Sequence, residues 1–471
     1  MAEHRPGESR MRGLLRFWFT FEKPVGPRAY FTHGFALALL KYAVDAALIA
    51  TFLGVLWTPL DYLATGASLS SSKLANAPTI LLIILALWTL PFFWIGEAMS
   101  VRRTMDAGLT PWVALLFFVP LLSYAFMLAM SVWPSASARP APARRTRESP
   151  SSTDRVVAIL AGLAIGLGMM AFSVLGMRRY GIALFLGTPF LIGAVSAFLF
   201  NRHAVTTMGQ TRRVVLLSLL ASGGALVFAS AEGLVCIAMA FPLALGIALL
   251  GAMVGRAIAL GGDYPTSHAL FGVLLLPASA PLLDSASRSP LREVRSAVEI
   301  DAPVDVVWRR VIAFPALPEP TDLVFRSGIA YPRGARIEGE GVGAIRYCEF
   351  STGAFVEPIT DWIPGKRLAF DVTASPPPLR ELSPYGRVIA PHLDGFFLAR
   401  RGEFRLVALA GGRTRLEGST WYELRLQPHL YWAILSDRLV GRIHDRVLQH
   451  VRDVSAHDVQ RNLRVTSPPH Q

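Results

Sequence analysis

Residues 296–315, Ser-Ala-Val-Glu-Ile-Asp-Ala-Pro-Val-Asp-Val-Val-Trp-Arg-Arg-Val-Ile-Ala-Phe-Pro, mark the point where an apolar chain gives way to a soluble domain. Apolar or small side chains occupy every second position from Val294 to Ile300, which predicts a half-buried strand. Asp301 is the expected N-cap of the helix that follows, with Pro303 preset for its start. Apolar residues then recur at helical spacing, at Val304, Val307, Trp308, Val311 and Ile312.

Alternating side chains continue beyond this helix and predict an antiparallel sheet. Ser351-Thr352-Gly353, Pro364-Gly365-Lys366 and Gly411-Gly412 separate the alternating runs, as tight turns do. The expected strands lie near residues 345–350, 355–359, 368–372, 404–408 and 414–420.

The last predicted element is a long amphipathic helix, because apolar residues recur every three or four positions from Trp432 to Val451. A strand, an Ala-Pro break, a Val-Trp helix, antiparallel strands and this helix, in that order, resemble the SRPBCC superfamily. That superfamily is also called START-like, Bet v 1-like, or polyketide cyclase/dehydrase and lipid transport. The resemblance covers about residues 290–457. It implies an α+β helix-grip domain, in which a curved antiparallel sheet and the helix enclose a cavity for an apolar molecule.

The chain before residue 286 is dominated by apolar stretches. Hydrophobic residues make up 52% of the sequence and charged residues 17%, a balance uncommon in soluble proteins. Each stretch approaches the roughly 20 apolar residues that cross a bilayer. We therefore expect a multi-pass α-helical membrane region of about eight spans in two blocks. The stretches are 33–57, 77–96, 111–133, 156–176, 180–200, 213–231, 234–258 and 267–284.

The loop between the second and third stretches carries a recurring pattern. Two arginines are followed by an aspartate, a glycine and an aromatic residue, at Arg102, Arg103, Asp106, Gly108 and Trp112. This pattern resembles the bacterial inner-membrane domain of unknown function numbered eight hundred and five, over about residues 10–134. The histidine that this family places before the aspartate is Met105 here. The two arginines either keep the loop in the cytoplasm or bind headgroups.

These patterns divide the chain into five segments. A Pro-, Ala- and Arg-rich stretch without periodicity is typical of a disordered linker, and the C-terminal tail has no strong pattern. The segments are a three-span membrane domain at 1–133, the linker at 134–154, a second membrane block of four or five spans at 155–285, the helix-grip domain at 290–457 and a disordered tail at 458–471.

Three polar residues lie within or beside the expected spans. Lys41 and Asp45 are four residues apart, so they share a helix face and can pair, or they could line an ion or proton path. Glu232 stands at a span boundary. It is either an acid at membrane depth with a function, or part of a turn exposed to headgroups.

Charge and cysteine content limit the classes of partner and cofactor that we expect. The net charge of +13 is carried mostly by scattered arginines, which suits contact with membrane lipids better than nucleic-acid recognition. The two cysteines, Cys236 and Cys348, lie in different regions and indicate neither a disulfide framework nor a metal site. We expect no cofactor.

The arginines give a mixed signal for topology. Those before residue 30 and at 102–103 favour a cytoplasmic N-terminal side, but three spans would then place the arginine-rich linker outside. Together with the two resemblances, the composition indicates the inner membrane of a bacterium. We favour a cytoplasmic C-terminal domain, because domains of the resembled superfamily usually work there.

The implied cavity supplies the candidate binding site. Such cavities are mainly apolar with a few placed polar groups, and the unidentified ligand is expected to be a hydrophobic small molecule. The expected lining residues are Tyr347, Phe355, Glu357, Phe370, Val372, Phe396, Phe397, Trp421 and Trp432.

Three functions remain open for this domain. We favour non-catalytic binding of a lipid-like molecule at the membrane. The first alternative is an enzyme acting on an apolar or polyketide-like substrate, with His392 and Asp394, Glu357 or Tyr347 as candidate acid–base groups. The second is a membrane scaffold whose core is filled by its own side chains. No nucleophile elbow, metal-ligand cluster or phosphate loop occurs, so we assign no catalytic residue.

Overall fold

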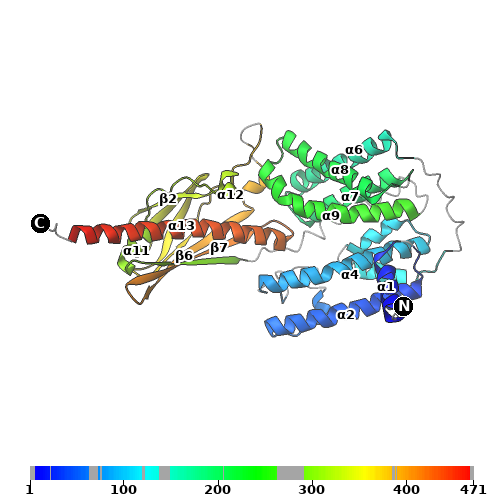
Figure 1. Cartoon of the computed structure of the whole chain (residues 1–471), viewed down its shortest axis with the longest axis horizontal. Coiled ribbons are helices and arrows are strands. Elements are labelled where there is room, and N and C mark those ends of the chain that lie inside the picture. The colour runs from blue at the N-terminus through cyan, green and yellow to red at the C-terminus, as the bar shows by residue number, and fades with distance from the viewer. Residues whose placement is uncertain are drawn as a thin grey trace, which may run out of the picture. The chain divides into compact units, whose positions relative to one another are not determined.

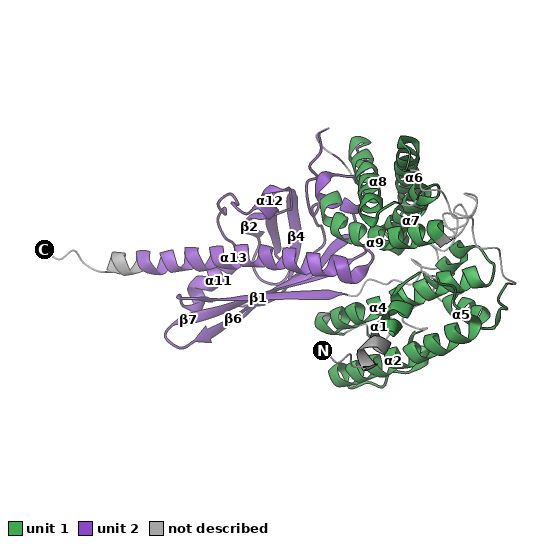
Figure 2. Cartoon of the chain, turned by 45° about the vertical axis from the view of Figure 1, so that its right-hand side comes forward, with its two compact units in different colours: residues 1–229, 237–288 green, residues 230–236, 289–471 purple. Residues whose placement is uncertain are grey.

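The computed structural model describes residues 6–466, apart from residues 22, 63–72, 75–76, 119–121, 137–148, 205, 262–290, 385–387 and 389. The chain divides into two compact units. Unit 1 comprises residues 1–229 and 237–288, and unit 2 comprises residues 230–236 and 289–471 (Figure 2). The predicted linker at 134–154 and span at 267–284 fall largely or wholly outside the described residues.

Unit 1 is helical (Figure 1). Within the described residues, six helical segments are long and apolar enough to cross a membrane, which agrees with the multi-pass architecture predicted from the sequence. Its elements are α1 (Pro6–Phe19), α2 (Pro27–Leu53), α4 (Thr79–Asp106), the 3₁₀ helix η2 (Pro111–Phe118), α5 (Leu122–Val132), α6 (Ser152–Met170), the π-helices η3 (Ala171–Gly176) and η4 (Ala183–Gly187), α7 (Thr188–Asn201), α8 (Met208–Phe228) and α9 (Leu234–Gly261).

The predicted span at 111–133 does not form one helix. It consists of η2 and the short α5, and the sequence between them contains Pro120, which lacks a backbone N–H donor. The chain then returns to the end of α4, where the Ala136 N–H donates to the Asp106 carbonyl at 2.8 Å. Residues 107 and 136 therefore both lie beside the end of α4.

Small residues allow the helices of the second membrane block to approach closely. A Cβ atom built at Gly162 of α6 would lie 2.7 Å from the Cβ atom of Ser218 on α8. A Cβ atom built at Gly255 of α9 would lie 1.8 Å from the carbonyl oxygen of Ala194 on α7. Glycine is required at both contacts, as expected where small residues line helix interfaces in a membrane.

Unit 2 contains an antiparallel sheet of seven described strands in the order β1-β7-β6-β5-β4-β3-β2, with a long helix along it (Figure 1). This architecture confirms the predicted helix-grip fold. Its elements are β1 (Arg292–Ile300), α11 (Val304–Ile312), α12 (Leu323–Arg326), β2 (Pro332–Glu338), β3 (Ile345–Phe350), β4 (Gly353–Ile363), β5 (Arg367–Asp371), the 3₁₀ helix η5 (Pro391–Leu393), β6 (Phe397–Leu409), β7 (Arg413–Leu424) and α13 (His429–Thr466).

Residues 296–315 and the strand that precedes them fold largely as their pattern predicts. Side chains of β1 alternate between half-buried and exposed and end at the fully buried Ile300. The helix cap differs from the expectation, because Pro303 rather than Asp301 precedes the first turn of α11. The Pro303 carbonyl accepts from the Val306 and Val307 N–H groups, at 3.1 and 3.2 Å, and supports this turn without a capping side chain.

The turn between β6 and β7 and the long helix α13 position the candidate site. Gly411 and Gly412 have positive φ angles, 77° and 70°, in the turn between β6 and β7, as the predicted Gly-Gly hairpin requires. Helix α13 continues past residue 457 to Thr466, so the segment predicted as a disordered tail begins as helix. The helix buries Val447, Leu448 and Val451 in the same apolar core as strands β5, β6 and β7.

Candidate functional site

A cavity of about 130 Å³ lies between the concave face of the sheet and α13. Five strands and the helix contribute to its wall. Its lining residues are Arg346, Cys348, Phe350, Phe355, Glu357, Phe370, Val372, Phe397, Ala399, Arg401, Gly402, Glu403, Phe404, Gly418, Ser419, Thr420, Val440, Ile443, His444, Val447 and Leu448.

One wall of the cavity holds a buried ion pair. Arg346 donates through Nη1 to Glu357 Oε2, and the two side chains are 2% and 7% exposed. The Arg346 guanidinium also lies over the rings of Phe370 and Phe404, 5.3 and 5.5 Å from their centroids. Burial disfavours the guanidinium charge, but the attraction of Glu357 outweighs it and raises the pKa of Arg346. The arginine therefore places a permanent charge beside the cavity.

A second polar group comes from α13. The Nε2 atom of His444 lies 2.8 Å from the Thr420 hydroxyl on β7. Burial lowers the pKa of His444 to about 4, so the imidazole is neutral at ordinary pH. Its Nδ1 atom is buried and has no hydrogen-bond partner within the residues that the structure describes.

Cys348 also lies in the cavity wall, beside the ion pair. Burial raises the pKa of its thiol to about 12. The side chain is therefore a neutral thiol that adds apolar surface rather than a nucleophile.

The structure brings together some of the predicted lining residues and not others. The cavity wall includes Phe355, Glu357, Phe370, Val372 and Phe397. The remaining predicted lining residues do not contribute to it, namely Tyr347, Phe396, Trp421 and Trp432.

Strand alternation explains two of these differences. Arg346 and Cys348 face the cavity, so Tyr347 between them points to the other face, where Arg336 lies 3.9 Å above its ring. Thr420 faces His444 in the same way, so the side chain of the neighbouring Trp421 lies on the other face of β7. On β3 the sequence pattern placed the Tyr347 ring inside, whereas the structure places the charged Arg346 there.

His392, predicted as a possible acid–base group with Asp394, does not line this cavity. It lies in η5, with its Nδ1 atom 3.2 Å from Glu232 and its Nε2 atom 2.7 Å from the Cys236 sulfur. Glu232 thus lies in the segment Ser230–Cys236 of unit 2 and contacts a histidine.

The paired arginines of the membrane loop are both buried at the end of α4. Arg102 donates to the carbonyls of Phe17, Thr20 and Lys23, close to the end of α1. The Phe17 carbonyl lies in the last turn of α1, where C=O groups have no partner within the helix, so the arginine acts as a cap.

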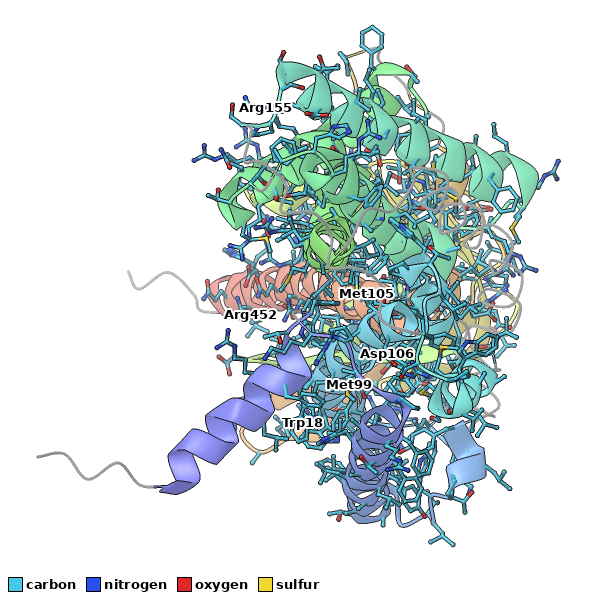
Figure 3. The ribbon with its side chains drawn as sticks, turned by 90° about the vertical axis from the view of Figure 1, so that its right-hand side faces the viewer. Trp18, Met99, Met105, Asp106, Arg155 and Arg452 are labelled. Atoms are coloured by element: carbon cyan, nitrogen blue, oxygen red, sulfur yellow. The ribbon has the colours of Figure 1, made fainter. Side chains whose placement is uncertain are left out.

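Arg103 plays the same role for α5. Its Nε atom donates to the Met130 carbonyl at 2.8 Å, and its other nitrogens donate to the Trp133 carbonyl and to Asp106. The Ser135 hydroxyl also donates to Asp106 at 2.6 Å, and Asp106 lies at the end of α4 (Figure 3). Both arginines are therefore engaged by backbone and are not exposed for headgroup binding.

The other residues of the loop motif support this arrangement. Gly108 has a positive φ angle of 73° directly after α4, which a side chain would disfavour. Trp112 is fully buried and meets Phe198 edge-to-face, with the ring centroids 5.7 Å apart.

Lys41 and Asp45 form the predicted pair within α2. The Tyr62 hydroxyl donates to the same Asp45 oxygen at 2.7 Å, and the Lys41 ammonium lies 5.3 Å from the Tyr62 ring centroid. The three side chains form one local cluster that compensates the buried carboxylate.

Comparison with known proteins finds one family model for the N-terminal part of the chain. The family model "Protein of unknown function (DUF805)" matches residues 19–140, which confirms the resemblance predicted for the membrane loop. No curated protein is similar enough to the chain to count as a match. The fold and the matched family together define a multi-pass membrane protein that carries a helix-grip domain.

Solved structures similar to part of the chain include an aromatase/cyclase, Zhui, from Streptomyces sp. R1128, with 18% identity over 36% of this chain and 96% of that chain and a TM-score of 0.25. Norcoclaurine synthase from Thalictrum flavum is 12% identical over 36% of this chain and 88% of that chain, with a TM-score of 0.24. A protein from Nitrosospira multiformis is 18% identical over 34% of this chain and 94% of that chain, with a TM-score of 0.22.

Proposed function

We propose that the helix-grip domain binds a small hydrophobic molecule without chemically altering it, and that the membrane helices hold the domain at the bilayer. The observation that carries the proposal is an apolar cavity with phenylalanine walls and a few buried polar groups. This combination is typical of ligand sites. A scaffold with a filled core would need the cavity to be closed by side chains.

The cavity volume indicates the size of the ligand. An engineered cavity of about 150 Å³ in another protein holds one benzene molecule, and the cavity here measures about 130 Å³. One ring or a short acyl segment fits this space, whereas a complete two-chain lipid does not. Any larger ligand would leave part of its body outside the cavity.

Two buried atoms indicate that the ligand also carries a polar group. Within the described residues, neither His444 Nδ1 nor Arg346 Nε has a hydrogen-bond partner. A buried polar atom without a partner costs about 1–3 kcal/mol, so a ligand hydroxyl or carbonyl that reaches one of them recovers this energy. We therefore favour a ring or short chain with one oxygen substituent.

The titration behaviour of the lining groups favours binding over catalysis. An effective general base has a pKa near the working pH, whereas that of His444 is lowered to about 4. A nucleophilic cysteine needs a depressed pKa, whereas that of Cys348 is raised to about 12. Arg346 and Glu357 are engaged with each other in a buried ion pair.

The test is to purify the full-length protein from a bacterial host in detergent, extract it with organic solvent and identify the released molecules by mass spectrometry. Val372 lines the cavity, so Val372→Trp should fill it and abolish retention of the bound molecule. Val407, on β6, is 48% exposed, and Val407→Trp provides the matched control that keeps the molecule.

A molecule retained equally by both tryptophan variants would place the binding elsewhere and contradict the proposal. Folding of each variant is checked by hydrogen exchange of β5 and β6. A wild-type protein that yields the same extract as the detergent blank would also count against a binding function.

We further propose that the protein resides in a bacterial inner membrane, in contact with its lipids, with the arginine-rich ends of the helices in the cytoplasm. Arg102 contacts residues 17–23, and Asp106 contacts residues 135–136, so these segments share one side of unit 1. Since Ala136 bonds to Asp106, we propose that the chain enters the arginine-rich stretch from that same side. A span at 111–133 would instead place the arginine-rich linker outside, where arginine-rich loops are disfavoured.

The side of the C-terminal domain follows from the chain path. The candidate span Met208–Phe228 separates Arg212 and Arg213, at its start, from the segment Ser230–Cys236. That segment belongs to unit 2. We therefore propose, against the expectation of a cytoplasmic domain, that unit 2 faces the side of the membrane opposite to Arg212 and Arg213. An active C-terminal alkaline phosphatase fusion would support this, and a fluorescent C-terminal GFP fusion would contradict it.

A further inference from the structure

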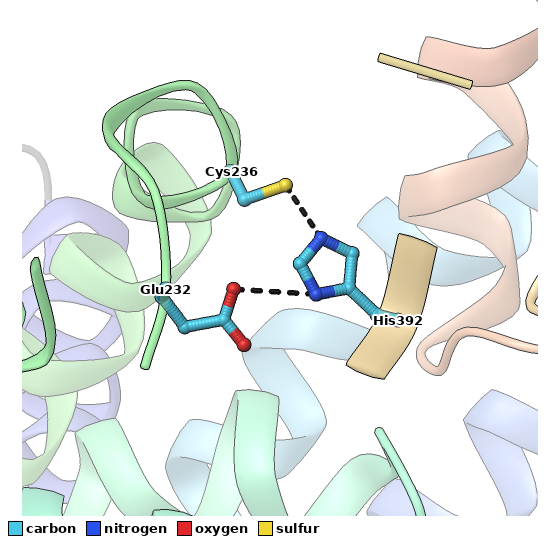
Figure 4. Close-up of side chains that lie close together, drawn as sticks. All are labelled: Glu232, Cys236 and His392. Carbon is cyan, nitrogen blue, oxygen red and sulfur yellow. Dashed lines mark hydrogen bonds and ion pairs between the residues drawn. The ribbon is translucent and has the colours of Figure 1, made fainter. Parts of the chain in front are cut away.

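Four titratable side chains of unit 2 converge outside the helix-grip cavity. The Cys236 sulfur lies 2.7 Å from His392 Nε2, and Glu232 Oε2 lies 3.2 Å from His392 Nδ1 (Figure 4). Glu381 Oε1 lies 4.0 Å from His392 Nε2. The ligand atoms of Glu232, Cys236 and His392 all lie within 4.8 Å of one another.

The cluster is assembled from two distant parts of the sequence. Glu232 and Cys236 flank the start of α9, whereas Glu381 and His392 lie between β5 and β6. The backbone fixes the two parts together, because the Leu234 N–H donates to the Leu382 carbonyl at 3.0 Å. Gly233 leaves the space for Glu381, since a Cβ atom there would lie 2.0 Å from its carboxylate.

Charge is the first argument for a cation. Glu232 and Glu381 are each 4% exposed, and His392 is 9% exposed. Two buried carboxylates lie beside one thiol and one imidazole, so acidic groups outnumber basic ones among these four side chains. Buried charge of one sign is costly unless an opposite charge or a metal ion compensates it.

The two faces of the imidazole supply the second argument. Its Nε2 side meets a thiol and a carboxylate, while its Nδ1 side meets a second carboxylate. Histidines that bind metals usually donate their other ring N–H to a carboxylate, which fixes the tautomer and the ring orientation. Glu232 has the position of that orienting carboxylate.

We propose that Cys236 Sγ, His392 Nε2 and Glu381 Oε1 bind a divalent transition metal, with Glu232 as the positioning residue behind the histidine. A sulfur, a nitrogen and an oxygen donor together suit Zn²⁺. Three protein ligands leave one position of a tetrahedral ion for water or another ligand. Sulfur and nitrogen donors of a tetrahedral zinc site lie roughly 3.5 Å apart, which small side-chain rotations at Cys236 and His392 provide.

The same arrangement could be mistaken for a cysteine–histidine–glutamate triad, but the backbone argues against acyl transfer. The N–H groups of Val235 and Cys236, which would stabilise an oxyanion beside the sulfur, donate to the Glu381 carboxylate at 3.2 and 3.3 Å. A carboxylate in the place of the oxyanion opposes both a thiolate and a tetrahedral intermediate. A metal ion is instead attracted by this carboxylate.

The first test measures the metal content of the full-length protein, purified in detergent without added metal or chelator. We expect about one zinc per chain by plasma mass spectrometry, and its loss in Cys236→Ser and His392→Ala. Cys348→Ser, which changes the other cysteine, should keep the metal. Zinc content that is the same in all four proteins, or absent in every one, would overturn the site.

The second test uses Co²⁺ as the probe on chelator-treated full-length protein. Wild type should show a sulfur-to-cobalt charge-transfer band at one equivalent. Glu232→Gln keeps the shape of the side chain, so it should fold and bind Co²⁺ about 10- to 100-fold more weakly. An unchanged cobalt affinity in this variant would contradict the positioning role, and a band that survives Cys236→Ser would contradict the thiolate ligand.

The third test needs no loss-of-ligand variant. In Cys348→Ser the chain has one remaining cysteine, Cys236. Its alkylation by a maleimide should be slow with Zn²⁺ bound and faster after chelation, and added Zn²⁺ should restore protection. Fast alkylation that ignores both chelator and metal would indicate a free thiol and overturn the proposal.

Discussion

Arg346 on β3 donates a hydrogen bond to Glu357 from the position directly opposite on β4. Both side chains are buried in the cavity wall, among phenylalanine rings that face the guanidinium. Buried ion pairs are seldom a large source of net stability, because desolvation offsets their attraction. We propose that this pair orients a ligand in the cavity.

Removing one member of this pair should be strongly destabilising. Glu357→Gln leaves the buried arginine uncompensated, which costs about 3–5 kcal/mol. Hydrogen exchange of the β3 and β4 amides in the full-length protein measures the loss. Glu349→Gln is the control, because Glu349 lies on β3, the strand of Arg346, in an exposed pair with Arg336 and should change stability by less than about 1 kcal/mol. Equal effects of the two changes would show that the interior pair carries no special energy.

The cavity histidine predicts a stability loss in acid. The unfolded chain takes up a proton on His444 near pH 6.5, whereas the folded protein does so only near its lowered pKa of about 4. The unfolded state therefore holds more protons between these values, and stability falls as pH decreases from about 6.5 to 4, by at most about 3 kcal/mol.

His429 behaves in the same way, because burial also lowers its pKa to about 4. His444→Gln should therefore remove about half of the acid-induced loss, measured by denaturant unfolding at pH 7, 6 and 5. An unchanged dependence of the free energy of unfolding on pH in His444→Gln would contradict the prediction.

Two glycines on neighbouring strands of the cavity wall, Gly402 on β6 and Gly418 on β7, differ in the space around them. A Cβ atom at Gly402 would lie 2.4 Å from the Phe370 ring, whereas one at Gly418 would have ordinary contacts at 3.6 Å with Leu448 and Phe404. Gly402→Ala should displace Phe370 and weaken ligand retention at least about fivefold, since overpacking costs about 1–3 kcal/mol. Gly418→Ala should retain the ligand within about threefold of wild type. The co-purifying amount per chain measures both, and the reverse order would refute the assignment of this wall.

The membrane loop predicts that lysine cannot replace Arg103. Arg103→Lys keeps the charge but cannot reach Met130, Trp133 and Asp106 together, so a buried carbonyl loses its donor at a cost of about 1–3 kcal/mol. The full-length protein should unfold at a lower temperature and become sensitive to protease between residues 107 and 136. Arg213→Lys, at an exposed position, should have no such effect. Identical melting of the two variants would argue against the capping role.

The sequence predicts the helix-grip fold because its signals are local. Alternation in β1, the Gly411-Gly412 turn and the spacing of α13 each specify one element. The cavity wall was harder to predict, because alternation fixes two faces but not which one is buried. A rule that places aromatic rings inside selects Tyr347 and rejects Arg346.

The signal that resolves this ambiguity is present in the β3–β4 hairpin. A turn at residues 351–352 pairs position 346 with 357, so arginine and glutamate lie opposite each other across the strands. A charge pair of this kind can be buried, whereas a lone charge cannot. The four-residue cluster around His392 had no comparable signal, since Cys236 and His392 are 156 residues apart.

The central claim is that a small molecule occupies the cavity between the sheet and α13. The most direct measurement is photo-crosslinking of the full-length protein in detergent with a phenyl-diazirine, followed by peptide mapping. The label should fall on cavity residues of β6 and α13, Val440 among them, and should be lost in Val372→Trp but not in Val407→Trp. Labelling confined to the membrane helices, or equal labelling of the two variants, would contradict the claim.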